Sequence, residues 1–384
     1  MGINDCNNIT DFRKLARRRL PVPLFHYIDG GSDDEMTLRR NTTAFDNYSL
    51  MPQGLVDVSA IDMTTRVLGQ KIDWPLFLAP TGLTRLFHHE GERAVARAAA
   101  KAGTIYSLST LSAVSIEEIG ALTTGPKMFQ IYIHKDRGLT YEFINRCKAA
   151  GYNAMCLTVD TIVAGNRERD LVTGMTTPPK LTLASLLSFA LHPAWTLNYL
   201  THEKFKLANV ADRIAAGTGS SSSVIDYINA QFDRSLTWKD AEKAIAAWGG
   251  PFAIKGVMSV ADAKRAAEVG ASAVMVSNHG GRQLDSAPAP IDCIAPIVDA
   301  LGDKLEVILD GGVRRGTHVL KALALGAKAC SMGRPYLYGL AAGGQAGVER
   351  VLARLRAEVE RDMALMGCTS VAQITRDKVE RIQS

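Results

Sequence analysis

The sequence AVMVSNHGGRQLD at positions 273–285 joins a short apolar run to a polar loop that holds one histidine and one arginine. The apolar residues 273–276 predict a buried strand, and the two glycines let the backbone after it approach a ligand closely. His279 supplies a proton acceptor, and Arg282 supplies a planar cation that can pair with a small anion. Alone, the pair is equally consistent with a hydrogen-bonded loop histidine and a surface arginine. The rest of the chain must therefore decide.

Apolar runs of the same kind recur along the chain and alternate with amphipathic helical patterns. Eight runs predict strands, at residues 76–79, 104–108, 128–133, 154–159, 252–257, 273–277, 306–309 and 329–332. Helical patterns occupy residues 92–102, 116–122, 139–149, 260–269 and 317–325, and Ser115 and Ser259 stand where N-caps are expected. Continuous apolar strands between helices indicate a parallel sheet, and eight such units predict a TIM (β/α)8 barrel.

Polar residues follow or end each predicted strand, where the active face of a TIM barrel lies. Any one of these groups is ordinary, but a set at all the strand ends is difficult to explain as packing, so we expect them to form one site. In chain order they are Pro80, Thr81 and Gly82; Ser109; Gln130 and Tyr132; Thr158 and Asp160; Lys255; Ser277 and His279; Asp310, Gly311 and Gly312; and Gly333 with Arg334.

The composition is that of a globular protein with a sizeable core. The chain has 384 residues, of which 47% are hydrophobic and 22% charged, so we expect one domain over residues 1–384 with an N-terminal helical extension at 1–74. The net charge of +5 is spread thinly, and its densest cluster, Arg17-Arg18-Arg19, lacks the aromatic residues of a nucleic-acid surface. The six cysteines form no C-x-x-C pair and the first ten residues lack a secretory pattern. We therefore expect reduced thiols, a cytoplasmic location and no nucleic-acid partner.

The connection between the fourth and fifth strands, residues 161–251, is far longer than a usual crossover. Its residues 181–200 carry no charged side chain, but an internal His-Pro pair argues against a membrane-spanning helix. We expect segment 181–210 to lie on a membrane surface instead, with Trp195 and Tyr199 at the interface and lysines 180, 204 and 206 beside it. A mobile lid or an oligomer contact is the alternative. Residues 215–224, rich in Gly and Ser, predict a flexible linker.

Two stretches rich in glycine and arginine follow the last two strands, GGVRRG at 311–316 and GRP at 333–335. Backbone N–H groups and guanidinium groups in this position form the recurrent phosphate site of TIM barrels, so we expect a phosphorylated cofactor or substrate. No G-x-G-x-x-G motif opens an N-terminal βαβ unit, which argues against a nicotinamide-binding Rossmann domain. His88, His89 and Glu90 are adjacent, so their side chains should diverge, and we expect no metal site.

Most of the chain resembles the FMN-dependent 2-hydroxy acid dehydrogenase and oxidase family. The similarity runs from Phe25-His26-Tyr27 to Met366-Gly367-Cys368, and its most specific part is SNHGGRQLD at 277–285. The other matching motifs are LAPTG at 78–82, QIY at 130–132, LTVD at 157–160, KG at 255–256 and LDGGVR at 309–314. The resemblance implies FMN as the cofactor and a small 2-hydroxy acid as the substrate.

The resemblance also implies which residues act on the substrate. His279 would be the base, and Asp160 would orient it and stabilise its charged form. Whether His279 takes the Cα proton or the hydroxyl proton stays open. The substrate carboxylate would pair with Arg282 and Arg167, and its other oxygens would accept hydrogen bonds from Tyr27 and Tyr132.

The remaining residues at the strand ends would bind the flavin. Lys255 would lie near the pyrimidine end of the ring, where its charge favours the anionic reduced form. The implied contacts are Ser109, Gln130, Thr158 and Ser277 at the polar edge of the ring, Pro80, Thr81 and Gly82 at its face, and Asp310, Gly311, Gly312, Arg314, Gly333 and Arg334 at the ribityl chain and phosphate.

Departures from the family pattern bear on the substrate. Leu111 stands where plant glycolate oxidases carry a bulky aromatic residue, and Gly82 stands where many oxidases have alanine. The stretches GNRERD at 165–170 and HPAW at 192–195 are similar to membrane-associated lactate and mandelate dehydrogenases, whose electrons pass to quinone. An apolar wall of Leu111 and Ala164 would accept a methyl group or a larger side chain. We therefore expect oxidation of L-lactate to pyruvate with a quinone or cytochrome as acceptor, and (S)-mandelate as the second candidate substrate.

Two other functions remain open at this point. A soluble oxidase of the same family would pass electrons to oxygen and release hydrogen peroxide, and a barrel that binds flavin without turnover would serve sensing or scaffolding. The family implies a homo-oligomer, often a tetramer. The insertion implies peripheral attachment to the inner face of the cell membrane.

Overall fold

The structure is a computed structural model that describes residues 2–175, 180–210 and 233–382, so the linker predicted at 215–224 lies outside the described residues. Eight parallel strands close into a barrel in the order β10-β11-β4-β5-β6-β7-β8-β9. The predicted TIM barrel is confirmed, and each strand ends within two residues of its predicted position. The strands are β4 (Leu76–Thr81), β5 (Tyr106–Ser109), β6 (Lys127–Ile131), β7 (Ala154–Thr158), β8 (Phe252–Val257), β9 (Ala273–Val276), β10 (Glu306–Asp310) and β11 (Ala329–Met332).

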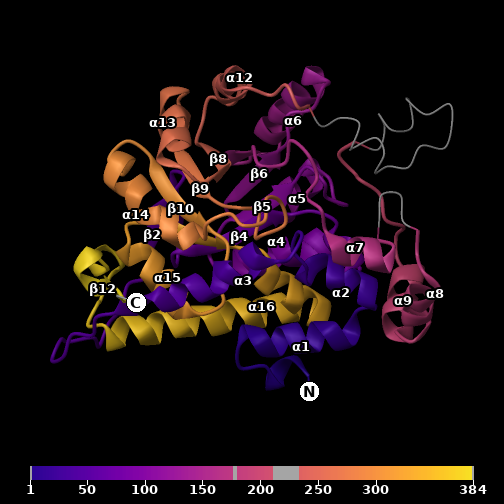
Figure 1. The fold of residues 1–384 in the computed structure, drawn as a ribbon, viewed down its shortest axis with the longest axis horizontal. Coiled ribbons are helices and arrows are strands. Elements are labelled where there is room, and N and C mark those ends of the chain that lie inside the picture. The colour runs from indigo at the N-terminus through magenta and orange to yellow at the C-terminus, as the bar shows by residue number, and fades with distance from the viewer. Residues whose placement is uncertain (1, 176–179, 211–232, 383–384) are drawn as a thin grey trace.

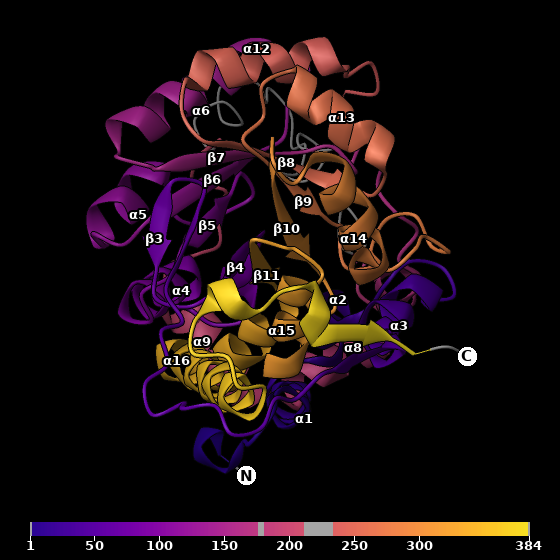
Figure 2. The ribbon, with the colours of Figure 1, turned by 90° about the vertical axis from the view of Figure 1, so that its left-hand side faces the viewer.

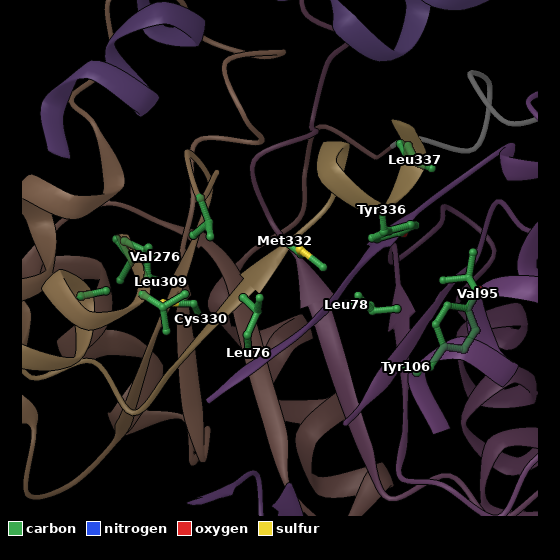
Figure 3. Close-up of a cluster of buried hydrophobic side chains, with 14 of the residues drawn as sticks. Leu76, Leu78, Val95, Tyr106, Val276, Leu309, Cys330, Met332, Tyr336 and Leu337 are labelled. Carbon is green, nitrogen blue, oxygen red and sulfur yellow. The ribbon is translucent and has the colours of Figure 1, made fainter. Parts of the chain in front are cut away.

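Alternate side chains of each strand belong to two separate buried clusters, as the two-residue period of a strand requires. Phe77, Met128 and Met275 belong to the cluster inside the barrel. The hairpin of β2 (Thr65–Val67) and β3 (Gln70–Ile72) adds Leu68 and Ile72 to this inner cluster and so closes one end of the barrel. The outer cluster joins strands to helices, and Figure 3 shows Leu76, Leu78, Tyr106, Val276, Leu309, Cys330 and Met332 with the helix residues Val95, Tyr336 and Leu337.

Helices cover the outside of the barrel (Figures 1 and 2). Ser115 and Ser259 cap α5 and α13, because their side chains accept from the N–H groups of Glu118 and Asp262 at 3.1 Å. Three of the helices around the barrel had no predicted counterpart, α12, α14 and α16. Helix α14 contains Pro296, and α16 is interrupted by non-helical backbone at two glycines, 343 and 344, which obscures its period. The helices are α4 (Gly91–Lys101), α5 (Ile116–Leu122), α6 (Arg137–Ala149), α12 (Trp238–Trp248), α13 (Val260–Glu268), α14 (Pro290–Leu301), α15 (Gly316–Ala324) and α16 (Arg334–Leu365).

The first 74 residues place three helices beside the barrel, α1 (Ile9–Arg19), α2 (Val22–Asp29) and α3 (Met36–Thr43). Helix α1 buries Phe12, Leu15 and Ala16 and lies along α16 (Figure 1). The segment is not helical alone, because it also contains β2, β3 and β1 (Tyr48–Leu50), which pairs antiparallel with β12 (Val379–Arg381) near the other end of the chain.

The described part of the insertion forms α7 (Glu168–Thr173), α8 (Leu183–Ala190) and α9 (Pro193–Thr201), and it ends with α12 before β8. Helices α8 and α9 lie together at one side of the barrel (Figure 1). Every helix in the described ranges is either too short or too polar to span a lipid bilayer. Trp195 and Tyr199 are half-buried and line a cavity, and their contact with a membrane stays a prediction. The exposed large hydrophobic side chains of α8 and α9 are leucines, at positions 183, 186, 187, 191, 197 and 200.

Candidate active site

A cavity of about 760 Å³ lies at the carboxyl ends of the barrel strands. Its lining includes all the residues that the sequence predicted for the site except Gln130, Thr158, Asp160 and Ser277. Three of these four are hydrogen bonded to a lining residue, and Thr158 pairs in register with the lining residue Lys255. The barrel therefore brings the predicted residues together, although they come from all eight strand ends.

His279 and Asp160 form a hydrogen-bonded pair, with His279 Nδ1 at 2.9 Å from Asp160 Oδ1. A proton on Nδ1 leaves Nε2 as the acceptor that faces the cavity. Burial lowers the pKa of His279, and the nearby Asp160 charge opposes that shift only in part. Burial would raise the pKa of Asp160, but the charge and hydrogen bond of His279 outweigh it and the pKa is lowered. The pair therefore consists of a neutral base and an ionised carboxylate.

Lys255 supplies a buried positive charge to the same cavity. Its Nζ lies 3.1 Å from Asp310 Oδ2 and donates to Ser277 Oγ at 3.1 Å. Burial opposes this charge, but Asp310 and Asp160 outweigh it, so the pKa of Lys255 is raised. Asp310 also accepts hydrogen bonds from Ser277 and Ser331, so both of its carboxylate oxygens are used inside the protein. Asp310 thus holds Lys255 in place and also lines the cavity, and the contact with the ribityl chain that the resemblance implied stays a prediction.

Two arginines flank the ring of Tyr27. The guanidinium carbons of Arg282 and Arg167 lie 4.8 Å and 5.5 Å from the ring centroid. Burial, followed by the charge of Arg167, lowers the pKa of Arg282 to about 10. Arg282 Nη1 donates to the carbonyls of Tyr27 and Gly30, which orients the guanidinium. The two guanidinium groups repel each other, and a small carboxylate bound between them would offset that repulsion. The pair beside the Tyr27 phenol therefore forms a candidate carboxylate site.

The side chain of Arg334 is hydrogen bonded to backbone groups of the protein. Its guanidinium donates to the carbonyl oxygens of Ile28 at 2.9 Å, Gly30 at 2.7 Å and Gly280 at 2.8 Å. It therefore joins the end of α2 to the loop that carries His279. Because Arg334 is the first residue of α16, its backbone N–H is among the unpaired donors of that helix and can bind a phosphate.

A model of the FMN-dependent dehydrogenase family matches residues 16–381. This chain belongs to that family. It is 45% identical to the L-lactate oxidase of Nostoc sp. over 371 residues, which cover 96% of each chain. It is 41% identical to glycolate oxidase 3 of Oryza sativa subsp. indica over 372 residues, 97% of this chain and 95% of that one. A crystal structure of the monotopic membrane protein (S)-mandelate dehydrogenase superposes with a TM-score of 0.93 at 36% identity, covering 98% of this chain and 100% of that one.

FMN, the cofactor of the FMN-dependent dehydrogenase family, fits the groups that the site leaves open. Gln130 Nε2 is buried without a hydrogen-bond partner among the described residues, so it can donate to the polar edge of a flavin ring. Gly312 has a φ of 75°, and a Cβ there would lie 1.8 Å from Asn41 O, so only glycine lets the backbone follow this path. Arg314 lines the cavity after β10, and burial lowers its pKa. A phosphate beside Arg314 would favour the charged form of its guanidinium group.

Some residues of this family member's site were not predicted. Ser331 lies inside the eighth predicted strand and has no signal that separates it from a packing residue. The apolar wall of the cavity includes Phe87, Met175, Phe189 and Phe205, which come from segments far apart in the sequence. The uncharged stretch at 181–200 is the available signal for part of this wall, although we interpreted it as a membrane surface, with a mobile lid or an oligomer contact as the alternative.

The prediction that adjacent histidines diverge is wrong for His88 and His89. Their ring centroids lie 4.5 Å apart, and the ring of His202 stacks on His89 at 3.7 Å. The turn before α4 places the rings of His88 and His89 on the same side of the chain. The third ring, that of His202, comes from the residue just after α9. Within the described ranges no group of three His, Cys, Asp or Glu residues is arranged to hold a metal ion.

Proposed function

We propose that this FMN-dependent 2-hydroxy acid oxidoreductase is an L-lactate dehydrogenase that works on the cytoplasmic surface of a membrane and passes its electrons to a quinone. One observation carries the proposal. The cavity that holds His279 and Arg282 continues to an apolar wall made by α8 and α9, and the other sides of these helices carry exposed leucines. A lipophilic acceptor could thus reach the site from a membrane surface.

The residues of the site can perform the oxidation of a 2-hydroxy acid. Arg282 and Arg167 bind the carboxylate, and Tyr27 and Tyr132 lie where they can donate to its oxygens. His279 Nε2 accepts a proton from the substrate, and ionised Asp160 stabilises the imidazolium that forms. FMN, when bound, accepts the two electrons.

The apolar part of the substrate pocket favours a small side chain. Leu111 and Ala164 both line the cavity, as expected for a wall that receives a methyl group. A Cβ at Gly82 would lie 2.9 Å from the Cβ of Leu111, so these two residues fix the width of the site together. (S)-Mandelate is the second candidate, because the apolar wall beyond Leu111 includes Phe87 and could receive a phenyl ring.

The substrate is tested by anaerobic mixing of the yellow enzyme with L-lactate, (S)-mandelate and glycolate. We expect L-lactate to bleach the flavin fastest. Fastest bleaching by (S)-mandelate would reassign the substrate, and no bleaching by any 2-hydroxy acid would refute the reaction itself. With substrate present, a soluble quinone analogue should speed turnover well beyond oxygen, whereas rapid peroxide release without it would identify an oxidase.

The membrane contact is tested by sedimentation with anionic lipid vesicles. We expect the wild type to sediment with the vesicles and a triple variant, Leu183→Ser, Leu187→Ser and Leu191→Ser, to stay in solution. A control triple, Leu55→Ser, Leu284→Ser and Leu365→Ser, also removes exposed leucines but lies outside α8 and α9, so it should still sediment. Equal behaviour of the two triples would remove the support for a membrane surface at this lobe.

A further inference from the structure

A row of three histidines joins α9 to the barrel outside the lining of the cavity. His88 and His89 come from the turn between η3 (Thr84–Leu86) and α4, and His202 follows the last turn of α9. The rings of His88 and His89 lie 4.5 Å apart at 32°, and those of His89 and His202 lie 3.7 Å apart at 21°. The proposed catalytic chemistry uses none of these rings.

The hydrogen bonds of Asn198 determine the protonation state of His89. Asn198 Oδ1 accepts from the backbone N–H of His89 at 3.1 Å, which fixes the orientation of the amide because a backbone N–H can only donate. The Nδ2 group of Asn198 therefore faces His89 Nδ1, 2.7 Å away, and donates to it. An acceptor nitrogen carries no hydrogen, so this contact requires neutral His89.

The neighbouring rings and charges also disfavour a proton on these rings. Burial, then the charge of His89, lowers the pKa of His88 to about 4. Burial, then the charge of His202, lowers the pKa of His89. The other charged groups that face the row are Arg85 of η3, which donates to the His89 carbonyl; Glu90, paired with Arg97 of α4; Glu203, paired with Arg93 of α4; and Arg19 at the end of α1.

Among the described residues, α9 packs on α8 but has few other hydrogen bonds or ion pairs to the barrel. None of its residues is buried. Trp195 Nε1 donates to the carbonyl of Leu86 at 2.9 Å, and Glu203, just after the helix, pairs with Arg93 at 3.2 Å. The side of α9 toward the barrel nevertheless lines the cavity, through Trp195, Thr196, Tyr199 and Leu200. The two bonds between Asn198 and His89 therefore help to hold a wall of the active site.

We propose that Asn198 and His89 are positioning residues that hold α9 against the barrel, and that protonation of His89 Nδ1 releases this wall and opens the cavity. A proton on Nδ1 would face the amide N–H of Asn198, so two donors would meet and the contact would be lost. The added charge would also repel His88, His202 and Arg85. Because the contact involves no substrate group, the proposal holds whatever the substrate and acceptor are.

The direction of the pH dependence follows from linkage. The closed form binds fewer protons than the open form, since the amide N–H of Asn198 faces His89 Nδ1 and excludes a proton from it while the contact is made. Closure is therefore fully favoured above the ordinary histidine pKa of about 6.5, and its advantage falls as the pH drops below that value. For one proton, the open fraction rises up to about tenfold for each pH unit, until the lowered pKa of the closed form is reached.

The test is hydrogen exchange by mass spectrometry on the flavin-loaded enzyme, measured at about pH 7.5 and about pH 5.5 and corrected for the intrinsic exchange rate. Peptides that cover residues 193–203 should exchange about tenfold faster at the lower pH, while peptides of the barrel strands should not change. Equal corrected rates at the two pH values would overturn the proposal.

Substitutions separate positioning from a general loss of stability. In Asn198→Asp, a carboxylate accepts from both the backbone N–H and a protonated Nδ1, so α9 should be held more firmly at low pH and the response should reverse. Asn198→Leu should exchange fast at both values. His192→Gln changes a histidine at the other end of α9, where Nδ1 contacts the Ser188 carbonyl at 2.6 Å, and should keep the wild-type response. A wild-type response in Asn198→Asp would assign the effect to another group, and the flavin absorbance of each variant reports whether it has folded.

Discussion

Lys255 is buried and His279 half-buried in the active site, yet the loss of water has opposite outcomes for their charges. Lys255 has two carboxylates nearby, Asp310 and Asp160, and their attraction exceeds the cost of burial. His279 has Asp160 alone and is repelled by Lys255 and Arg282, so burial dominates. The cavity thus holds a permanent cation, Lys255, and a neutral base, His279. The base can remove a proton, and the cation can stabilise the negative charge that develops.

Replacement of the base tests this residue-scale account. His279→Asn should keep the yellow FMN spectrum and slow flavin reduction by about 10²- to 10⁴-fold, the usual contribution of a general base. In the wild type, kcat/KM should fall as the pH drops, because a protonated imidazole cannot accept a proton. That decline should begin below about pH 6.5, since the pKa of His279 is lowered. Stopped-flow reduction across a pH series measures both effects, and undiminished reduction in the variant would rule out His279 as the base.

At the scale of elements, α2 is positioned by the groups around its last turn. The Asp29 carboxylate accepts from Arg13 of α1 at 2.5 Å and 2.7 Å, from Tyr338 of α16 at 2.8 Å and from Arg169 of α7 at 3.2 Å. Helix α2 carries Tyr27, and α7 follows directly on Arg167, so one carboxylate links two elements that hold substrate groups. Arg282 and Arg334 donate hydrogen bonds to backbone carbonyls at the same end of α2.

Asp29→Asn should therefore affect both stability and substrate binding. The amide can accept with one oxygen only, so we expect a loss of about 1–3 kcal/mol in the free energy of unfolding. KM for the hydroxy acid should rise more than kcat falls, because Tyr27 and Arg167 lose their alignment. Asp34→Asn, an exposed carboxylate on the following loop, is the control and should change neither quantity. The pKa of Asp29 is lowered despite burial, so its stabilising effect should persist at neutral pH and disappear only as the pH falls below about 4.

At the scale of the whole molecule, the cavity places several cationic groups at the open end of a closed barrel. Arg314, Arg334 and Arg282 are half-buried there, and burial lowers the pKa of each. Groups that are costly to bury without an anion make the empty protein less stable than the loaded one.

FMN should accordingly raise the thermal stability of the whole chain. At a ligand concentration of 100 times the dissociation constant, linkage predicts about 2.7 kcal/mol of added stability. Riboflavin, which lacks the phosphate, should raise Tm less than FMN at equal concentration. The difference between the two ligands should shrink in Arg314→Gln. A thermal melt of the stripped protein with each ligand measures this, and equal shifts by FMN and riboflavin would show that the residues after β10 and β11 do not hold the phosphate.

Much of the fold was predictable because its signals are local. The eight strands and their helices follow from runs of apolar residues and from caps such as Ser115, which act within a few positions of the chain. The predicted site residues could also be named, since a TIM barrel carries its polar groups at the strand ends. Most of the missed parts lack such a local signal: Pro296 and a pair of glycines obscure α14 and α16, and Ser331 looks like any small strand residue. Helix α12 is the exception, because Thr237 and Asp240 form a capping box at its start that the prediction did not use.

The sequence by itself determined the barrel, the family and the residues that meet at its mouth, because periodicity and motif order survive without knowledge of contacts. Only the tertiary structure decided that Asp310 forms an ion pair with Lys255 and that the Arg334 side chain donates hydrogen bonds to carbonyls at the end of α2. The tertiary structure alone also decided that Trp195 lines the cavity. It also decided that His88 and His89 lie side by side with His202. These outcomes depend on which side chains from distant segments compete for the same partner, and that competition is settled only when the chain is folded.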